Sequence, residues 1–188
     1  KQVAFTSCQP IKGEMHKKLC KDPVGADMEI AVTVKRDAPD RTLRLIPKVL
    51  HLGIGCRKNT PYEIIEEKVS ACMEADGFDW RAVKSVASID LKKDEAGLIA
   101  FCKAHDLPFH VYSSEELKEL TGDFTPSRFV GSITGVDNVC ERSAVLDAVR
   151  AEKDAGKDTE GYEILRRKTA GDGVTVAIAA EKWSVSFE

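Results

Sequence analysis

Around residue 50 the chain changes from a strand pattern to a helix pattern. Over residues 50–54, leucine and isoleucine alternate with histidine and glycine, which is typical of a buried strand. A helix start follows, because Thr60 and Glu63 have the spacing of a capping box and Pro61 suits the first helical position. The stretch therefore predicts a strand, a tight turn and a helix, around which we expect the rest of the chain to be organised.

Strand and helix patterns continue to alternate towards the carboxyl terminus. The order of these elements predicts the α/β class, as a three-layer helix/sheet/helix sandwich with a mixed, mostly parallel sheet. The expected elements are a helix at 61–76, a strand at 83–89, a helix ending at 105, a strand at 109–112, a long helix that residues 135–141 open and that ends near 155, strands at 164–168 and 174–180, and an antiparallel edge strand at 183–187.

The residues before Pro47 have weaker patterns. We expect a short strand at 3–6, a helix at 12–20 and a half-buried strand at 29–35. A boundary is placed near Pro47, so that residues 1–46 are interpreted as the remnant of a preceding region and residues 47–188 as the α/β domain. A chain of 188 residues is long enough for one full domain with its own core and a small attachment.

Charge and composition exclude several classes of protein. Lysine and arginine total 28 against 31 aspartate and glutamate residues, so no basic excess favours a nucleic-acid partner. No apolar run approaches the ~20 residues of a membrane helix, and the first residues do not resemble a signal peptide, so we expect a cytoplasmic protein with no membrane partner. The six cysteines are scattered without a C-x-x-C pair, which favours reduced thiols and argues against a zinc site.

The glycine turn at Gly53 and Gly55 is the first candidate binding element. It lacks the third glycine of a dinucleotide fingerprint, and no phosphate-binding loop, G-x-S-x-G or H-E-x-x-H motif is present. One alternative is a plain structural turn that lets strand and helix pack closely. Arg57 and Lys58, however, follow a strand at the position where open α/β sheets bind ligands, and this favours a site for an anionic group.

Further polar candidates also follow strands or begin helices. If the sheet is parallel, these positions lie at one edge and can converge. Each carboxylate could instead cap or complement a helix, and each lysine could be a solvated surface charge. The candidates are Ser88, Asp90, Lys92 and Glu95 after one strand, Glu141 at the start of the long helix, where it has capping-box spacing to Asn138, and Lys168 near the end of the chain.

Cysteine and histidine provide weaker candidates. Cys56 could be an inert packing thiol, or a nucleophile whose pKa is lowered by a helix N-terminus and by Arg57. His51 lies within the buried strand and is interpreted as a hydrogen-bonded structural residue rather than a catalyst. Cys102 and His105 share a helix face, but two ligands do not make a metal site, so we expect no metal ligands from the protein.

Four segments, in this order, carry a resemblance to a known family. They are L-G-I-G-C-R at 52–57, A-S-I-D-L-K at 87–92 with Glu95, Gly97 and Leu98, the residues Gly135, Val139, Cys140, Glu141 and Ala144, and Lys168 with V-T-V-A-I-A at 174–179. Together they resemble the C-terminal domain of CbiG, the cobalt-precorrin 5A hydrolase of the anaerobic cobalamin pathway. CobE of the aerobic pathway is similar to this domain alone.

The resemblance covers about residues 43–188. It implies that the preceding residues are the tail of the family's central region and that the family's N-terminal domain is missing from this chain. It also implies a corrin-type substrate and, in full-length CbiG, hydrolytic opening of a ring lactone with loss of acetaldehyde. Cobalt would arrive as part of the substrate, with no other cofactor, and other enzymes of the cobalamin pathway are expected as partners.

The resemblance and the residue patterns together define a hypothetical site. Cations can hold the carboxylates of a polyacidic macrocycle, and hydrolysis needs a base for water and an acid for the departing oxygen. We expect the catalytic residues to be Asp90, Glu95 and Glu141, and the substrate-binding residues to be Gly53, Gly55, Cys56, Arg57, Ser88, Lys92, Gly135 and Lys168. Two alternatives stay open, namely a non-catalytic CobE-like module that binds or presents a corrin intermediate and a nucleotide- or phosphate-binding domain.

Overall fold

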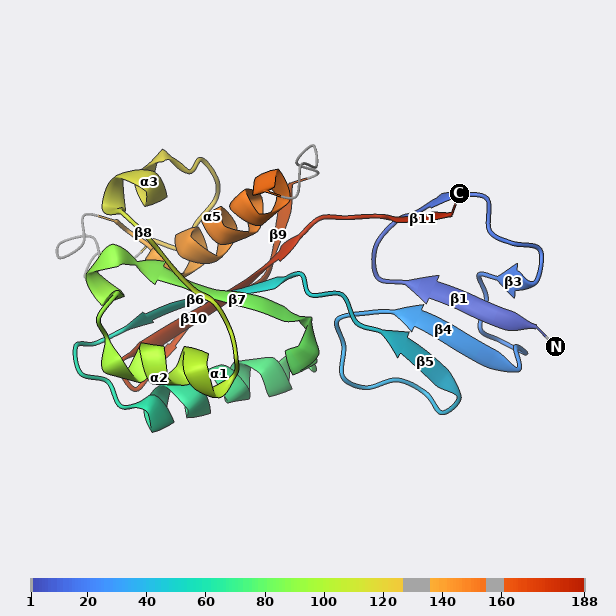
Figure 1. Cartoon of the computed structure of the whole chain (residues 1–188), viewed down its shortest axis with the longest axis horizontal. Coiled ribbons are helices and arrows are strands. Elements are labelled where there is room, and N and C mark those ends of the chain that lie inside the picture. The colour runs from blue at the N-terminus through green and yellow to red at the C-terminus, as the bar shows by residue number, and fades with distance from the viewer. Residues whose placement is uncertain (1, 127–135, 155–160, 188) are drawn as a thin grey trace.

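A five-stranded mixed sheet is the centre of the α/β part of the molecule (Figure 1). The computed structural model describes residues 2–126, 136–154 and 161–187. The strand order is β8-β7-β6-β10-β9, in which β6, β7 and β8 are parallel while β10 runs antiparallel to β6 and β9. The strands are β6 (Leu50–Cys56), β7 (Val83–Ile89), β8 (Phe109–Tyr112), β9 (Tyr162–Gly171) and β10 (Val174–Glu181).

Helices lie on both faces of this sheet (Figure 1). α1 (Tyr62–Ala75) and α2 (Ala96–Ala104) lie on one face, and α5 (Val139–Asp154) lies on the other, with the short α3 (Ser114–Glu119) nearby. Two single-turn 3₁₀ helices, η1 (Trp80–Ala82) and η2 (Asp90–Lys92), flank β7. The predicted mixed α/β fold is therefore confirmed, and none of the described helices is long and apolar enough to cross a membrane.

The alternation along β6 assigns its side chains to the two faces. Leu50, Leu52 and Ile54 are fully buried in the core cluster that includes α1 and α2 residues. His51 and Gly53 point to α5 instead, because successive side chains of a strand face opposite sides. The approach at Gly53 is so close that an added Cβ would lie 1.8 Å from the carbonyl oxygen of Cys140 in α5.

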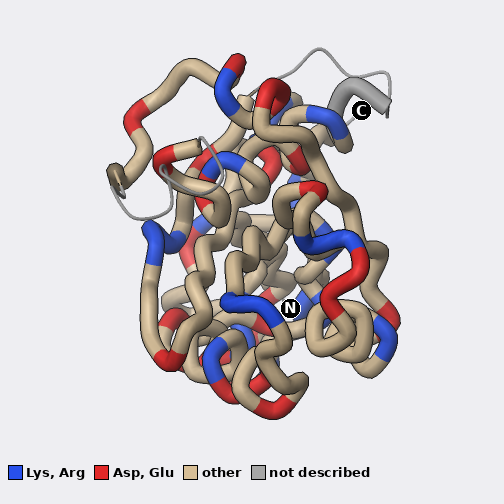
Figure 2. Tube along the Cα trace, turned by 90° about the vertical axis from the view of Figure 1, so that its left-hand side faces the viewer, with Lys and Arg blue, Asp and Glu red and all other residues tan. Residues whose placement is uncertain are grey.

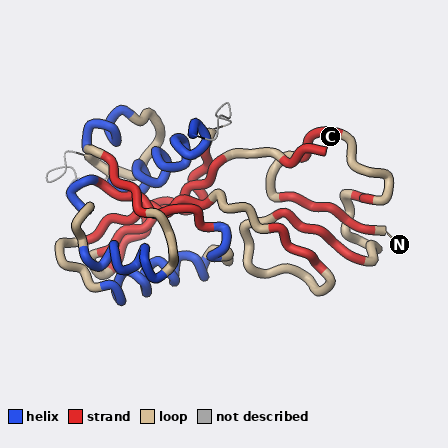
Figure 3. The backbone as a smooth tube through the Cα atoms, in the orientation of Figure 1, coloured by secondary structure: helices blue, strands red, loops and turns tan. Residues whose placement is uncertain are grey.

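A second group of strands carries both ends of the chain (Figure 3). Four of them form a separate parallel sheet in the order β3-β1-β4-β5, and β11 pairs with β2. The rings of Phe5 and Phe187 meet edge to face with centroids 5.0 Å apart, which joins these two small sheets. The strands are β1 (Val3–Ser7), β2 (Ile11–Gly13), β3 (Leu19–Cys20), β4 (Met28–Val32), β5 (Thr42–Leu45) and β11 (Val185–Phe187).

Three local predictions are wrong. Residues 12–20 are not a helix, because Ile11–Gly13 and Leu19–Cys20 pair as strands. The final strand β11 pairs in parallel with β2 rather than antiparallel at an edge of the main sheet. Thr60 does not cap α1, since Pro61 is the N-cap residue and the Thr60 hydroxyl donates instead to the carbonyl oxygen of Arg57 at 2.8 Å.

The close approach of α5 to β6 can be tested at Gly53. Gly53→Ala should lower the free energy of unfolding by about 3 kcal/mol, because the new Cβ would overlap the backbone of Cys140 and the helix must move. Urea denaturation followed by tryptophan fluorescence measures this change. The matched control is Gly55→Ala, whose Cβ would meet only the rotatable hydroxyl of Thr175 at 2.6 Å, so its cost should be clearly smaller. Equal costs for the two variants would contradict the predicted packing.

Candidate functional site

Several of the sequence-predicted residues that the structure describes lie at the end of the sheet where β6 and β7 end and β10 begins, which we name the carboxyl edge. Arg57 follows β6 there, and its backbone N–H donates to the carbonyl oxygen of Gly173 at 2.9 Å. Its side chain is exposed and its Cδ lies over Gly173. Figure 2 looks onto this end of the molecule, where basic and acidic positions are mixed along the trace. The backbone of Arg57 is therefore fixed at this end of the sheet, while its side chain is exposed.

Lys92 and Glu95 form an ion pair beside Cys56. The Lys92 ammonium lies 3.1 Å from Glu95 Oε2, and Glu95 Oε1 accepts the backbone N–H of Asn59 at 2.5 Å. Burial raises the pKa of the Cys56 thiol, with Lys92 lowering it and Glu95 raising it. Of the two alternatives for Cys56, the raised pKa favours the inert packing thiol over the low-pKa nucleophile, because desolvation of the thiolate outweighs the nearby cation.

Glu141 connects the start of α5 to β9. Its fully buried carboxylate accepts the backbone N–H groups of Lys168 at 2.7 Å and Thr125 at 2.9 Å. Burial alone would raise the pKa of Glu141, but these backbone hydrogen bonds outweigh it and hold the pKa below its usual range. Half of the expected capping box is present, since Asn138 accepts the backbone N–H of Glu141 at 2.9 Å. The Glu141 carboxylate is therefore ionised and fastens the helix to the sheet.

The other predicted residues lie at the same edge or outside the described part of the chain. The Ser88 hydroxyl donates to the carbonyl oxygen of Ile54 at 2.6 Å and bridges β7 to β6. Asp90 begins η2 and is partly exposed. Gly55 accepts from the Thr175 hydroxyl at 3.3 Å, while Gly135 lies outside the described residues. The carboxyl edge thus brings together two groups of predicted residues, one around Glu95 and one around Glu141.

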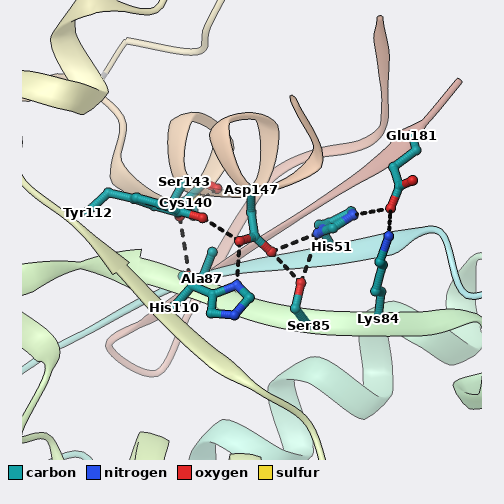
Figure 4. A network of polar contacts seen from close by, with 10 residues as sticks. All are labelled: His51, Lys84, Ser85, Ala87, His110, Tyr112, Cys140, Ser143, Asp147 and Glu181. Atoms are coloured by element: carbon teal, nitrogen blue, oxygen red, sulfur yellow. Dashed lines mark hydrogen bonds and ion pairs between the residues drawn. The ribbon is translucent and has the colours of Figure 1, made fainter. Parts of the chain in front are cut away.

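The structure also contains a buried polar network that the sequence did not predict as a site (Figure 4). Its centre is Asp147 of α5, whose carboxylate accepts from four side chains. Their nitrogens and hydroxyls converge from three parallel strands onto one helix residue. The donors are His51 Nδ1 at 2.7 Å, His110 Nδ1 at 2.6 Å, the Ser85 hydroxyl and the Tyr112 hydroxyl.

His51 lies between two carboxylates. Its Nδ1 faces Asp147 and its Nε2 lies 3.0 Å from Glu181 Oε1, which also pairs with Lys84 at 2.5 Å. Burial by itself would lower the pKa of His51, but the hydrogen bonds and charges of Asp147 and Glu181 outweigh it and raise the pKa. Each ring nitrogen faces a carboxylate, which can only accept, so the doubly protonated, cationic form of His51 is favoured. The hydrogen bonds expected of His51 are confirmed.

The same partners keep the two carboxylates ionised. Burial would raise the pKa of Asp147, yet the hydrogen bond and charge of His51 and the hydroxyl donors hold it well below its usual range. For Glu181, hydrogen bonds from His51 and Lys84 likewise outweigh burial and lower the pKa. Burial and the neighbouring Asp147 carboxylate raise the pKa of Tyr112, so its hydroxyl stays protonated and donates.

A pocket of about 580 Å³ opens beside this network. His51, Ser85, His110, Tyr112 and Asp147 all contribute to its wall. His51 and Asp147 have only 1% and 2% of their side chains exposed, whereas His110 is 48% exposed. His110 is therefore the histidine of the network that a molecule in the pocket can reach.

One signal in the sequence could have located the network. Cys140, Ser143, Ala144 and Asp147 follow each other at helical spacing and form a stripe of small and polar residues on α5. This stripe contacts the sheet, since Cys140 meets Gly53 and the Ser143 hydroxyl lies 3.3 Å from the carbonyl oxygen of Ala87. An aspartate on such a buried stripe requires polar partners from the facing strands.

Comparisons with known proteins agree on one pathway. A family model described as "Cobalamin synthesis G C-terminus" matches residues 50–179. The cobalt-precorrin-5A hydrolase of Salmonella typhimurium is 33% identical over 123 residues, which cover 64% of this chain and 35% of that protein. The chain thus spans about a third of the length of this curated relative.

Two solved structures share the fold. The crystal structure of CobE, a protein from the cobalamin (vitamin B12) biosynthetic pathway, matches with a TM-score of 0.63 and 27% identity over 72% of this chain and 92% of CobE. A cobalamin biosynthesis protein G homologue from Sulfolobus solfataricus matches with a TM-score of 0.55 and 17% identity, covering 96% of this chain and 51% of that chain. The second match shows a common fold that extends beyond residues 50–179.

The charge state of His51 makes a prediction about stability. His51→Gln should lower the free energy of unfolding by about 3 kcal/mol near pH 6, because it leaves the buried carboxylates of Asp147 and Glu181 without their shared cation. Urea denaturation measures this loss. The control His105→Gln removes a more exposed pair with Glu66 and should cost less than about 1 kcal/mol.

The pH dependence of that stability distinguishes charge from simple packing. A raised His51 pKa stabilises the fold fully below its unfolded pKa of about 6.5, and this contribution is lost as pH rises through the folded value. The lowered pKa values of Asp147 and Glu181 stabilise the fold above about pH 4.5 and lose this effect as pH falls through their folded values. The wild type should therefore lose stability above pH 6.5, and the His51→Gln variant should lose less. Parallel profiles would contradict a charged His51.

Proposed function

This chain belongs to the cobalamin synthesis G C-terminus family, and we propose from this premise that it is the C-terminal part of a cobalt-precorrin-5A hydrolase. The proposed reaction is hydrolytic opening of the ring lactone of the corrin intermediate with release of acetaldehyde. The name of the Salmonella typhimurium relative supports this proposal. Because the chain spans only about a third of that relative, the complete reaction is proposed for a protein in which this domain works with an N-terminal part.

We further propose that residues 1–46 belong to the central region of such a protein and residues 47–188 to its C-terminal domain. The match with the Sulfolobus solfataricus homologue, which covers 96% of this chain, supports a relation of the first residues to a longer protein of the same fold. The family model begins at residue 50, close to the proposed boundary. The pairing of β11 with β2 would then fasten the end of the C-terminal domain to the central region.

The carboxyl edge is the proposed place for the substrate. Arg57 carries this proposal, because its exposed guanidinium forms no ion pair with any carboxylate in the described part of the chain and so remains available to an acidic ligand. Lys168 is half-buried nearby, on the strand that Glu141 fastens. Lys92 is already paired with Glu95, so a substrate carboxylate would compete for it. A corrin intermediate with several acidic side chains would find separate cations along this edge.

Among the proposed catalytic carboxylates, Asp90 is the one best placed to act as the base for water. Its side chain is partly exposed and makes no hydrogen bond to a residue in the described segments. Glu95 and Glu141 accept backbone N–H groups and are buried, so in this proposal they hold the loops around the substrate and take part in proton transfer only after these bonds open.

The alternative function is a non-catalytic module that binds or presents a corrin intermediate. The CobE structure favours it, because CobE matches this domain over 92% of its own length. CobE therefore contains little beyond the domain that it shares with this chain. The two functions share the same binding site and differ in whether a lactone is opened.

Binding at the carboxyl edge can be measured with a corrinoid that carries free side-chain carboxylates. Arg57→Ala should weaken its binding by on the order of tenfold, because a charge-assisted hydrogen bond contributes about 1.5 to 3 kcal/mol. Absorbance titration gives the dissociation constant. Lys103→Ala removes an exposed cation at the opposite end of α2 and serves as the control, and the methyl-esterified corrinoid should bind equally to wild type and Arg57→Ala. Unchanged affinity in Arg57→Ala would mean that the substrate does not bind at this edge.

Catalysis is tested by joining the chain to the N-terminal part of a full-length relative and supplying cobalt-precorrin-5A. Acetaldehyde release, coupled to NADH oxidation by alcohol dehydrogenase, should fall at least a hundredfold in Asp90→Asn if Asp90 is the general base. Asp94→Asn is the matched control, because Asp94 is an exposed carboxylate four residues away on the same loop. Tight corrinoid binding without any acetaldehyde would instead establish the presenting module.

A further inference from the structure

We propose that the pocket beside Asp147 is a second site, in which His110 exchanges a proton with a small ligand that carries a carboxylate. It goes beyond the function proposed for the carboxyl edge and is separate from it in space. His51 at the pocket and Cys56 at that edge are five residues apart in β6, which corresponds to about 16 Å along a strand. The two sites can therefore be tested independently.

The orientation of His110 follows from its partner. Asp147 is ionised and can only accept, so the contact of 2.6 Å requires the proton to be on His110 Nδ1. In the neutral ring the lone pair is then on Nε2. Because the side chain is 48% exposed and belongs to the pocket wall, this lone pair is available to a ligand. Asp147 thus acts as a positioning residue and His110 as the acid–base group.

The charges around the pocket select the ligand. The carboxylates of Asp147 and Glu181 are buried and already accept from several donors, so they offer little to a bound molecule. The exposed groups are cations, since Lys84 has 37% and Arg150 has 45% of its side chain exposed. Each keeps one ion pair, Lys84 with Glu181 and Arg150 with Glu116, and each retains further N–H groups. A carboxylate is the anion that an arginine can bind with two parallel hydrogen bonds.

Arg150 is also held in a fixed position. Its guanidinium carbon lies 4.8 Å from the centroid of the Tyr112 ring, and one of its nitrogens is 2.5 Å from Glu116. A guanidinium that is fixed in this way loses little freedom when it binds a ligand. The volume of about 580 Å³ is in the range of pockets for small molecules.

The proton balance needs no other reactant. The Nε2 lone pair of neutral His110 takes the proton of an O–H group of the bound ligand and becomes an imidazolium. The oxygen that lost this proton keeps the electron pair of its O–H bond, and His110 returns the proton when the ligand leaves.

A network that only stabilises the fold would not require a half-exposed histidine in the wall of a pocket. His105 shows the structural case, because its Nε2 is occupied by Glu66 at 2.6 Å and its ring stacks on Trp80 with centroids 4.3 Å apart. In His110 it is Nδ1 that is occupied, by Asp147, and the half-exposed ring belongs to the pocket wall. This difference in which ring nitrogen is occupied distinguishes a histidine that can bind a ligand from one that only stabilises the fold.

The tautomers of the histidines provide the first test. Nitrogen-15 NMR of the full chain with neutral histidine rings should show His110 protonated on Nδ1, whereas His105 and His16 should be protonated on Nε2. His16 is a useful reference because its Nδ1 accepts the backbone N–H of Lys18 at 3.2 Å. His110→Gln assigns the signal. A His110 protonated on Nε2 would overturn the proposed proton exchange.

Ligand binding is the second test, with acetate as the probe and acetamide as its uncharged analogue. The ring signals of His110 should shift saturably with acetate and not with acetamide. Arg150→Gln should weaken acetate binding at least tenfold, while Lys103→Gln, an exposed cation on α2, should not change it.

The same titration separates this site from the carboxyl edge. Arg57→Ala should leave the acetate-dependent shift of His110 unchanged, even where it weakens binding of a carboxylated corrinoid. Three results would overturn the second site, namely no saturable shift, equal affinity in Arg150→Gln, and loss of the shift in Arg57→Ala.

Discussion

The contact between α5 and β6 is the constraint on which both candidate sites depend. At one end of the contact, Gly53 lets the carbonyl group of Cys140 approach the strand, and at the other end Asp147 reaches His51. Ionised groups buried at such a contact are costly unless hydrogen bonds replace their hydration. Here each carboxylate oxygen of Asp147 accepts from two side chains, which satisfies the charge and fixes the helix along the sheet.

This contact also separates two chemically different regions of the domain. At the carboxyl edge, backbone hydrogen bonds fix the main chain of two cationic residues. The N–H of Arg57 donates to Gly173, and the N–H of Lys168 donates to the Glu141 carboxylate. The pocket region has ionised groups whose positions are set by one another, with His110 as the accessible member. A ligand at the edge would meet the exposed side chain of Arg57, whereas a ligand in the pocket would meet a histidine whose orientation is set by Asp147.

The small strands near the two ends of the chain show that local structure can depend on residues that are distant in the sequence. Residues 12–20 have polar and apolar positions that are compatible with a weak helix, but Leu19 pairs with Val3 and Ile11 with Val185. Ile11 and Val185 are more than 150 residues apart in the sequence, so no local pattern predicts their pairing. The same reason explains why the last strand is parallel to β2 and is not part of the main sheet.

The sequence by itself determined the elements of the α/β domain, because hydrophobic periodicity and turn residues act over a few neighbouring positions. It also indicated that Arg57, Lys92 and Glu95 lie at one edge, since the ends of parallel strands must lie together. Only the tertiary structure decided that the Glu141 carboxylate is occupied by backbone N–H groups and that burial raises the pKa of Cys56. It alone revealed the Asp147 network, because hydrogen bonds and desolvation depend on groups that meet only when the helix is packed on the sheet.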